Sequence, residues 1–392
     1  MIYTVLLYGA TGFSGRLIAA EDRHRGLANV HGTPEPRMIL AGRDGDALKR
    51  LATQMGMEYR VFGLDDAEVV KRGLRDIDVV INAAGPFGRT AERLVDGAIA
   101  VRSHYVDING EIDVYKALKR HVQPADVDPA PVAVVCSAGY TPAASDIMLN
   151  AALRELVPSH LDWGAELGSV RIALSCTPEL SRGSAETVWR ALREDVQVVR
   201  RSRLAKEPVG NLERTFDFRK TRHGDDPSKR DLRVTSAANL VDTLTARLTG
   251  KARNFIVKNI ESYVEAGAVA RIAYQAGAML APFSRTRPVE FLVHQQITLL
   301  PPGPTDEELE RDKEIVVLDI EDPVRTRLVD WRWETPNAYR FTAQVVVEIA
   351  KRLTTAGVTG WRTPGTILQP HKAQLTAIQG AYRNCRLSER LP

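Results

Sequence analysis

The feature that most constrains this chain is a glycine-rich segment close to its first residue. Gly9, Gly12 and Gly15 follow the apolar run Ile2–Tyr8 and open the helical pattern Gly12–Ala28. Between a strand and a helix, glycines at this spacing allow a tight turn, close approach of the backbone to a pyrophosphate, and close packing of the helix on the strand. The helix N-terminus adds amide donors and a positive dipole. The whole segment is Gly9, Ala10, Thr11, Gly12, Phe13, Ser14 and Gly15. Its setting predicts a dinucleotide-binding turn rather than a purely structural one.

Apolar and amphipathic segments alternate over the first 140 residues. The strand-like segments after Ile2–Tyr8 are Arg37–Ala41, Tyr59–Phe62, Asp78–Ala83, Tyr105–Ile108 and Val132–Cys136. The helix-like segments are Gly12–Ala28, Ala47–Met55, Asp65–Gly73, Arg89–Ala100 and Val114–His121. Continuous apolar strands separated by amphipathic helices are typical of βαβ units, in which helices cover both faces of a parallel sheet. We therefore expect an α/β protein that begins with a doubly wound Rossmann domain.

The pattern changes after about Gly139. The 392-residue chain is long enough for two domains. Two strand-like runs follow late in the chain, at Ile315–Ile320 and Arg325–Trp333, and alternation in the second predicts a half-buried antiparallel strand. Helices are predicted at Val264–Phe283, Thr342–Leu353 and Gln369–Tyr382, and the charged stretch Arg193–Arg233 is interpreted as a solvated face or loop. These segments predict a second domain of the α+β class.

The end of the second predicted strand indicates which dinucleotide binds. The chain there reads Leu40-Ala41-Gly42-Arg43. NAD enzymes usually place an acidic residue here for the ribose 2′-hydroxyl, whereas NADP enzymes place an arginine near the 2′-phosphate, which a guanidinium can bind with two hydrogen bonds. Asp44 follows and keeps NAD open, although its short side chain also suits the N-cap of the next helix. We expect NADP, with Gly42 and Arg43 in the site.

Small residues follow the fourth predicted strand. At the carboxyl end of a central strand they leave space at the crevice of an open sheet, where a ribose and nicotinamide lie. A plain strand-to-loop turn is the structural alternative. The residues that we assign to the cofactor here are Ala83, Ala84, Gly85, Pro86 and Phe87.

Candidate proton donors follow the next two predicted strands. A phenol, or a carboxylic acid whose pKa is raised by burial, can protonate the atom left anionic after hydride delivery. Tyr140, Asp107 and Glu111 are the main candidates, with Ser137 and Cys136 as lesser ones. Each main candidate has a structural alternative. Asp107 can cap a turn, Glu111 can bind the nicotinamide ribose or cap the following helix, and Tyr140 can be a packing residue.

Composition excludes several classes of protein. A net charge of +4 without a concentrated basic patch argues against nucleic-acid binding. Three separated cysteines argue against a disulfide framework, and no two of the eight histidines are four residues apart, so no metal site is predicted. Ile2–Tyr8 lacks a basic leader, and Val264–Phe283 carries Glu265 and Arg271, so neither a signal peptide nor a membrane span is expected. We expect a cytoplasmic protein.

Five motifs carry a resemblance to a known family: Gly9–Gly15, Ala41–Arg43, Asn82–Phe87, Tyr105–Glu111 and Ser137–Asp146. In this order and spacing they resemble the saccharopine-dehydrogenase-like oxidoreductases. Pro302–Glu308, Thr342-Ala343 and Gly360–Pro364 are similar to the bacterial branch that contains trans-acting enoyl reductases, which serve lipid-making polyketide synthases. The resemblance implies an NADP-binding Rossmann domain over residues 1–140 and a substrate and dimerisation domain over 141–355. It also implies that the segment 356–392 packs back on the Rossmann domain.

The resemblance thins where substrate is recognised. The chain reads Ser181–Ala185 where relatives carry a Gly-Thr step, and Thr363–Thr366 is poorer in alanine than the family's tail. The expected function is NADP(H)-dependent reduction of an enoyl or lipid-linked acyl substrate, presented by a carrier protein or at a membrane surface. The basic stretch Arg193–Arg233 and the small-residue helix Val264–Phe283 motivate that substrate. The alternatives are an imine or amino-acid reductase of the saccharopine-reductase type and a non-catalytic NADP-binding scaffold or sensor.

Overall fold

The computed structural model describes the chain in segments and divides it into two compact units. The described residues are 3–28, 37–123, 130–159, 166–175, 180–191, 195–208, 210–218, 232–237, 246–247, 250–251, 254–265, 286–355, 357–369 and 386–389. One unit comprises Met1–Ala143 and Tyr339–Leu368, and the other Ala144–Ala338 and Gln369–Pro392.

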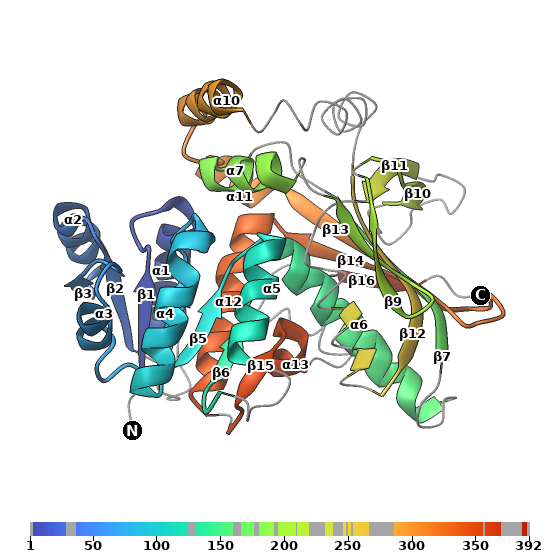
Figure 1. The fold of residues 1–392 in the computed structure, drawn as a ribbon, viewed down its shortest axis with the longest axis horizontal. Coiled ribbons are helices and arrows are strands. Elements are labelled where there is room, and N and C mark those ends of the chain that lie inside the picture. Colours follow the sequence, from blue (N-terminus) through green and yellow to red (C-terminus); the bar gives the residue numbers. More distant parts are fainter. Residues whose placement is uncertain are drawn as a thin grey trace. The chain divides into compact units, whose positions relative to one another are not determined.

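The first unit is built on a seven-stranded parallel sheet (Figure 1). Its strands are β1 (Thr4–Tyr8), β2 (Arg37–Gly42), β3 (Glu58–Val61), β4 (Val79–Asn82), β5 (His104–Asp107), β6 (Ala133–Val135) and β15 (Gly360–Arg362). They lie in the order β15-β6-β5-β4-β1-β2-β3, so β1 pairs with both β2 and β4. Chain order reverses between β1 and β4, which is where ligands bind in open α/β sheets. The predicted doubly wound Rossmann fold is confirmed.

Five helices connect these strands. They are α1 (Phe13–Ala28), α2 (Gly45–Met55), α3 (Ala67–Gly73), α4 (Phe87–Val101) and α5 (Ile112–Val122). Helix α1 packs beside α2, while α3, α4 and α5 pack in a row. Local chemistry fixes several of their ends: the side chains of Asp44 and Asp66 accept hydrogen bonds from the first-turn amides of α2 and α3. The predicted helices agree with the observed ones within a few residues, because caps and apolar periodicity are local signals.

The second unit contains a mixed nine-stranded sheet. Its strands are β7 (Glu166–Leu174), β8 (Val196–Arg200), β9 (Arg203–Glu207), β10 (Glu213–Asp217), β11 (Leu232–Ala237), β12 (Ile256–Glu265), β13 (Lys313–Glu321), β14 (Arg327–Pro336) and β16 (Arg386–Glu389). Its helices include α6 (Tyr140–Ser159), α7 (Arg182–Ala191), α10 (Arg287–Leu299) and α11 (Asp306–Arg311). Strands β7 and β12 are parallel, whereas β13 and β14 are antiparallel, as predicted for Arg325–Trp333. The α+β class is confirmed.

Segments near the end of the chain differ from the expected domain bounds. Helix α12 (Ala338–Leu353) lies almost entirely in the first unit, although it is expected within 141–355. Strand β15 pairs with β6 and extends the Rossmann sheet, and the short helix α13 (Pro364–Leu368) follows it. Strand β16 instead pairs with β14 in the second sheet, although 356–392 is expected to return to the Rossmann domain. An edge strand has unpaired backbone groups that can bind another strand. Within residues 356–392, β15 adds to the edge of the first sheet and β16 adds to the edge of the second.

Three segments correct the sequence interpretation of the second unit. Val264 and Glu265 end strand β12, so the predicted helix Val264–Phe283 does not begin there, and residues 266–283 lie outside the described part. Within Arg193–Arg233, strands β8, β9 and β10 replace the expected loop. Buried valines in β8 provide the apolar face that the charges conceal in the sequence. Gln369 is not helical, and residues 370–382 of the last predicted helix are also outside the described part.

Candidate functional site

The glycine turn joins the carboxyl ends of three central strands. Gly9 has a φ of +85°, and its amide donates to the Ala41 carbonyl at the end of β2 (2.9 Å). A Cβ atom on Gly9 would lie 2.7 Å from the Ala84 amide nitrogen, and one on Gly15 would collide with the Gly9 carbonyl oxygen. These two glycines are therefore required by the protein's own packing.

Gly12 differs from its two neighbours in the motif. It is exposed, its φ lies outside the left-handed region, and a Cβ atom there would meet only the Gly9 carbonyl oxygen, at 3.3 Å. An added Cβ atom would therefore meet fewer atoms here than at Gly9 or Gly15, although its one contact is tight. Helix α1 begins at the next residue and has no acidic side chain in its first turn, so the positive end of its dipole is not neutralised locally. Open space beside a helix N-terminus suits an anionic ligand.

The end of β2 separates the roles of two neighbouring charged residues. Asp44 Oδ1 accepts a hydrogen bond from the Ala47 amide (3.0 Å), so this carboxylate caps α2, as its structural alternative predicts. Arg43 is exposed at the end of the strand. Burial raises the pKa of Tyr8, and the nearby positive charge of Arg43 opposes that rise, which places the guanidinium close to the end of β1. Arg43 is therefore an exposed cation at the end of β2, the strand end from which the sequence predicts the choice of dinucleotide.

The loop after β4 is held by one backbone carbonyl and two side chains. The Ala83 amide donates to the Tyr8 carbonyl (2.9 Å), and the Ala84 amide donates to Asn82 Oδ1 (3.0 Å). Thr90 Oγ1 donates to the Ala84 carbonyl (2.6 Å), and a cis peptide bond joins Gly85 to Pro86. The residues assigned to the cofactor therefore form a fixed loop beside the glycine turn.

Glu111 also holds this loop. Its Oε1 accepts a hydrogen bond from the Phe87 amide (3.0 Å), the first residue of α4. Glu111 is the N-cap residue of α5, the helix that its structural alternative would have it cap. Its side chain makes no capping hydrogen bond to α5 and instead caps the preceding helix, α4. A carboxylate at a helix N-terminus is stabilised by the dipole and by the amides it accepts from.

Asp107 is completely buried and accepts four hydrogen bonds. Its donors are the amides of Asn109 and Ser137, the Tyr105 hydroxyl and the Cys136 thiol. Burial raises the pKa of Asp107 to about 6, although all four donors oppose the rise. Burial likewise raises the pKa of the Cys136 thiol well above its usual value, so the thiol stays protonated.

Tyr140 begins helix α6, directly after the loop that follows β6. Its ring packs edge to face against Phe341 of α12, with ring centroids 5.5 Å apart, and only 8% of the residue is exposed. Asp107, Glu111 and Tyr140 all follow the carboxyl ends of adjacent parallel strands, at the same sheet edge as the glycine turn. The polar residues Asn82, Thr90, Tyr105 and Asn109 join them and are absent from the sequence-based site. Of these four residues, only Asn82 and Asn109 could be expected at the site from the sequence, because they lie at or just after the end of an apolar strand.

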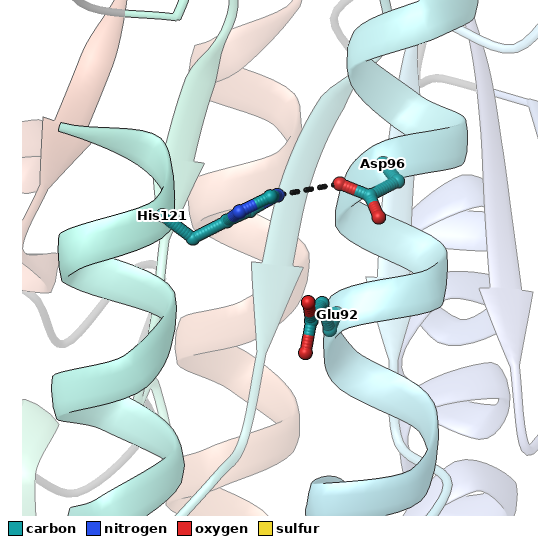
Figure 2. Close-up of side chains that lie close together, drawn as sticks. All are labelled: Glu92, Asp96 and His121. Carbon is teal, nitrogen blue, oxygen red and sulfur yellow. Dashed lines mark hydrogen bonds and ion pairs between the residues drawn. The ribbon is translucent and has the colours of Figure 1, made fainter. Parts of the chain in front are cut away.

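Glu92, Asp96 and His121 form a separate group on the surface formed by α4 and α5 (Figure 2). His121 Nε2 lies 2.6 Å from Asp96 Oδ1, and all three residues are exposed. The spacing of the histidines gives no sign of this group, because the two residues that lie four apart on one helix are Glu92 and Asp96. An exposed ion pair of this kind contributes at most about 1 kcal/mol to stability.

The segments that depart from the resembled family form helix N-termini. Ser181 Oγ accepts a hydrogen bond from the Ser184 amide (3.2 Å) at the start of α7. The Thr366 hydroxyl donates to the Thr363 carbonyl (2.8 Å) at the start of α13. Thr305 and Glu308, within the resembled segment Pro302–Glu308, form a capping box for α11. Local helix chemistry accounts for the residue types at all three places.

Comparisons with known proteins agree with the resemblance. No family model matches the chain. It is 26% identical to a trans-acting enoyl reductase of Mycobacterium tuberculosis over 220 residues, 53% of this chain and 48% of that protein. The chain therefore spans about half the length of the curated relatives it matches. The saccharopine dehydrogenase (L-Glu forming) of Saccharomyces cerevisiae has a similar fold, with a TM-score of 0.58 at 14% identity, over 98% of this chain and 100% of that one.

A second solved structure shows the same fold. The homospermidine synthase of Legionella pneumophila, in complex with NAD, has a TM-score of 0.58 at 9% identity, covering 99% of this chain and 91% of that one. The predicted resemblance to saccharopine-dehydrogenase-like proteins and trans-acting enoyl reductases is confirmed. Among the described helices, none combines the length and apolar character needed to cross a membrane.

Proposed function

We propose that this chain, a saccharopine-dehydrogenase-like oxidoreductase, binds NADP(H) and reduces an enoyl or lipid-linked acyl substrate. The observation that carries the proposal is the open position of Gly12 beside the N-terminus of α1, with Arg43 at the end of the adjacent strand. The similarity to trans-acting enoyl reductases supports the substrate class. When bound, the cofactor supplies the hydride.

Residues of the first unit bind the cofactor, position the loops around it and donate the proton. The glycine turn and the α1 dipole bind the pyrophosphate, and the loop Ala83–Phe87 lines the nicotinamide side of the crevice. Glu111 and Asp107 hold the crevice loops through the hydrogen bonds described above. We assign the role of proton donor to Tyr140, because the carboxylates of Asp107 and Glu111 accept hydrogen bonds from backbone amides.

Arg43 should give the protein a preference for NADPH over NADH. A charge-assisted contact to the 2′-phosphate is worth roughly 1.5–3 kcal/mol, which corresponds to about ten- to a hundred-fold in Kd. Titration of both cofactors into wild type and Arg43→Ala, followed by fluorescence, measures the preference. The substitution should weaken NADPH binding and leave NADH binding nearly unchanged.

Arg50→Ala supplies the matched control, since Arg50 is an exposed arginine on α2. That variant should bind both cofactors as wild type does. Equal affinity of the wild-type protein for NADPH and NADH would refute the proposed preference and return Asp44 to consideration.

Measurements of NADPH turnover with different substrates distinguish an enoyl reductase from an imine reductase and from a non-catalytic scaffold or sensor. Consumption of NADPH with enoyl thioesters of increasing chain length tests the main proposal. Consumption with an amino acid and a 2-oxo acid or aldehyde, but not with enoyl thioesters, would favour the imine reductase. Binding of NADPH without turnover of either class would favour the scaffold or sensor.

Helix α10 offers a surface for the presentation of such a substrate. Val289, Val293 and Ile297 form its half-buried or buried face, and the helix packs beside α7, with His294 Nδ1 2.7 Å from Glu186 Oε1. Its other face exposes Phe291 (63%), Leu292 (61%) and Leu299 (76%). An amphipathic helix with exposed large apolar side chains is typical of contact with a partner or a membrane surface. We propose that this face contacts the membrane that presents the acyl substrate.

Vesicle binding tests this surface. The double substitution Phe291→Ser and Leu292→Ser should reduce co-sedimentation with phosphatidylglycerol-containing vesicles severalfold, whereas Gln295→Ser with Gln296→Ser, on the same helix, should not. Wild-type protein that stays in the supernatant would contradict the membrane contact. A dimer that the apolar double substitution dissociates would assign the face to self-association instead.

A further inference from the structure

Two loops at the crevice edge are tied directly to one carboxylate. Asp107 Oδ1 accepts from the Asn109 amide (3.0 Å), in the loop after β5, and from the Ser137 amide (2.7 Å), in the loop after β6. Its Oδ2 accepts from the Tyr105 hydroxyl (3.0 Å). A backbone bond from the Ala138 amide to the Asp107 carbonyl (2.7 Å) joins the same two loops again.

The Tyr105 hydroxyl extends this network to the loop after β4. It accepts a hydrogen bond from Asn82 Nδ2 (3.0 Å), and Asn82 Oδ1 accepts from the Ala84 amide (3.0 Å). The Ala84 amide nitrogen is the atom that a Cβ on Gly9 would meet at 2.7 Å. A continuous chain of hydrogen bonds therefore leads from the buried carboxylate to the backbone against which the phosphate-binding turn packs.

The ionised carboxylate determines the direction of the bond that it shares with Tyr105. An ionised carboxylate only accepts, so the Tyr105 hydroxyl must donate its single proton to Asp107 and can only accept from Asn82. The Asn82 NH₂ group donates to Tyr105 and also to Thr90 Oγ1 (3.2 Å), while its oxygen faces the Ala84 amide, which can only donate. A donor in place of Asp107 Oδ2 would remove the acceptor for the Tyr105 proton, which would then face the Asn82 NH₂ group and weaken the support that Tyr105 gives to Asn82 and, through it, to the Ala84 peptide.

We propose that Asp107 is a positioning residue whose negative charge orients Tyr105, supports the Asn82 side chain that holds the Ala84 peptide, and thereby sets the affinity for the cofactor. This inference rests on the proposed binding of NADP(H). It reassigns a residue that the sequence analysis proposes as a proton donor.

The role implies that cofactor binding depends on pH. Because burial raises the pKa of Asp107 to about 6, the carboxylate loses its charge as the pH falls through that value. Tyr105 and Cys136 are the titratable groups that contact it, and burial raises the pKa of both, so neither titrates near pH 6. The folded-state pKa of Asp107 lies above its ordinary value, so protonation of Asp107 favours the folded state. The affinity for the cofactor should therefore fall below pH 6, whereas protonation of this carboxyl does not destabilise the folded protein.

The experiment measures the Kd of NADP⁺ between pH 5 and pH 8 for wild type, Asp107→Asn and Tyr105→Phe. The ligand's own phosphate titrates near pH 6, so the quantity of interest is the ratio of variant to wild-type Kd at each pH. Asp107→Asn should bind about tenfold more weakly than wild type at pH 8, the effect of roughly one hydrogen bond, and the ratio should approach one at pH 5. Tyr105→Phe, which keeps the ring volume and the carboxylate, should show the same trend. Asp96→Asn, the same change on the exposed surface of α4, should give a ratio of one throughout.

Two results would overturn the inference. A ratio that does not change with pH in both variants would show that the charge of Asp107 does not set affinity. Normal binding by Asp107→Asn with turnover reduced a hundredfold or more would make Asp107 the proton donor. If Asp107→Asn fails to fold by circular dichroism, Tyr105→Phe decides alone. Wild-type protein that binds neither NADP⁺ nor NADPH would overturn the proposed function itself, which the other outcomes leave standing.

Discussion

Replacement of Gly12 by valine should abolish NADPH binding and leave the first unit folded. A Cβ atom at Gly12 meets only the Gly9 carbonyl oxygen, at 3.3 Å, and the residue is exposed with a φ outside the left-handed region. We expect the fold to accept a side chain there after a shift of a few tenths of an ångström at the Gly9 carbonyl. A branched side chain would, however, occupy the space beside the α1 N-terminus where the pyrophosphate is proposed to bind. We expect the Kd of NADPH to rise by more than about a hundredfold, a loss of about 2.7 kcal/mol or more.

The other two glycines of the turn supply the contrast. Gly15→Val would place atoms on the Gly9 carbonyl, and Gly9→Val would combine a φ of +85° with a Cβ atom 2.7 Å from the Ala84 amide nitrogen. Both variants should lose folded protein as well as binding. Thermal unfolding followed by circular dichroism, beside the cofactor titration, separates the two effects. Undiminished binding by Gly12→Val would mean that the phosphates lie elsewhere.

Local signals explain why the first unit could be predicted. The central strands of the Rossmann sheet, such as β1 and β4, are short apolar runs, and helices such as α2 begin at a capping residue, Asp44, that is visible in the sequence. The glycine turn can be recognised from the strand that precedes it and the helix that follows it in the chain. The strand ends could also be located, so Asp107, Glu111 and Tyr140 were expected at one edge, where the parallel strands place them.

The roles of the crevice residues depend on partners that are distant in sequence. Glu111 caps α4 through Phe87, 24 positions earlier, and Asp107 accepts from Ser137, 30 positions later. No pattern in the sequence pairs these residues, because the pairing follows from the order of the strands. The same local sequence is compatible with a proton donor and with a cap.

The second sheet was harder to predict for a related reason. Glu261, Arg171 and Asp319 lie directly opposite one another across β12, β7 and β13, and Arg171 Nη1 is 3.5 Å from Asp319 Oδ2. In the sequence each of these charges suggests a solvated surface. In the sheet they neutralise one another on a largely buried face, so the charge pattern obscures the strands that carry it.

Tyr140→Phe should lower turnover with the proposed enoyl substrate by about 10²–10⁴-fold, the usual contribution of a positioned proton donor. The ring remains and keeps its edge-to-face contact with Phe341, so the fold and the Kd of NADPH should change little. Tyr115→Phe is the matched control, because Tyr115 is a buried tyrosine of α5 that packs on Trp361, outside the catalytic assignment.

Glu111→Gln completes the comparison, since a glutamine oxygen can still accept from the Phe87 amide and preserve the cap while the acidic proton is lost. Single-turnover rates of NADPH oxidation at saturating cofactor, measured across pH, distinguish the two residues. If Tyr140 donates the proton, Glu111→Gln retains most of the wild-type rate and Tyr140→Phe does not. The opposite ranking, with Tyr140→Phe fully active, would refute the phenol as donor and transfer that role to Glu111, whose cap on α4 would then be a second function of the same side chain.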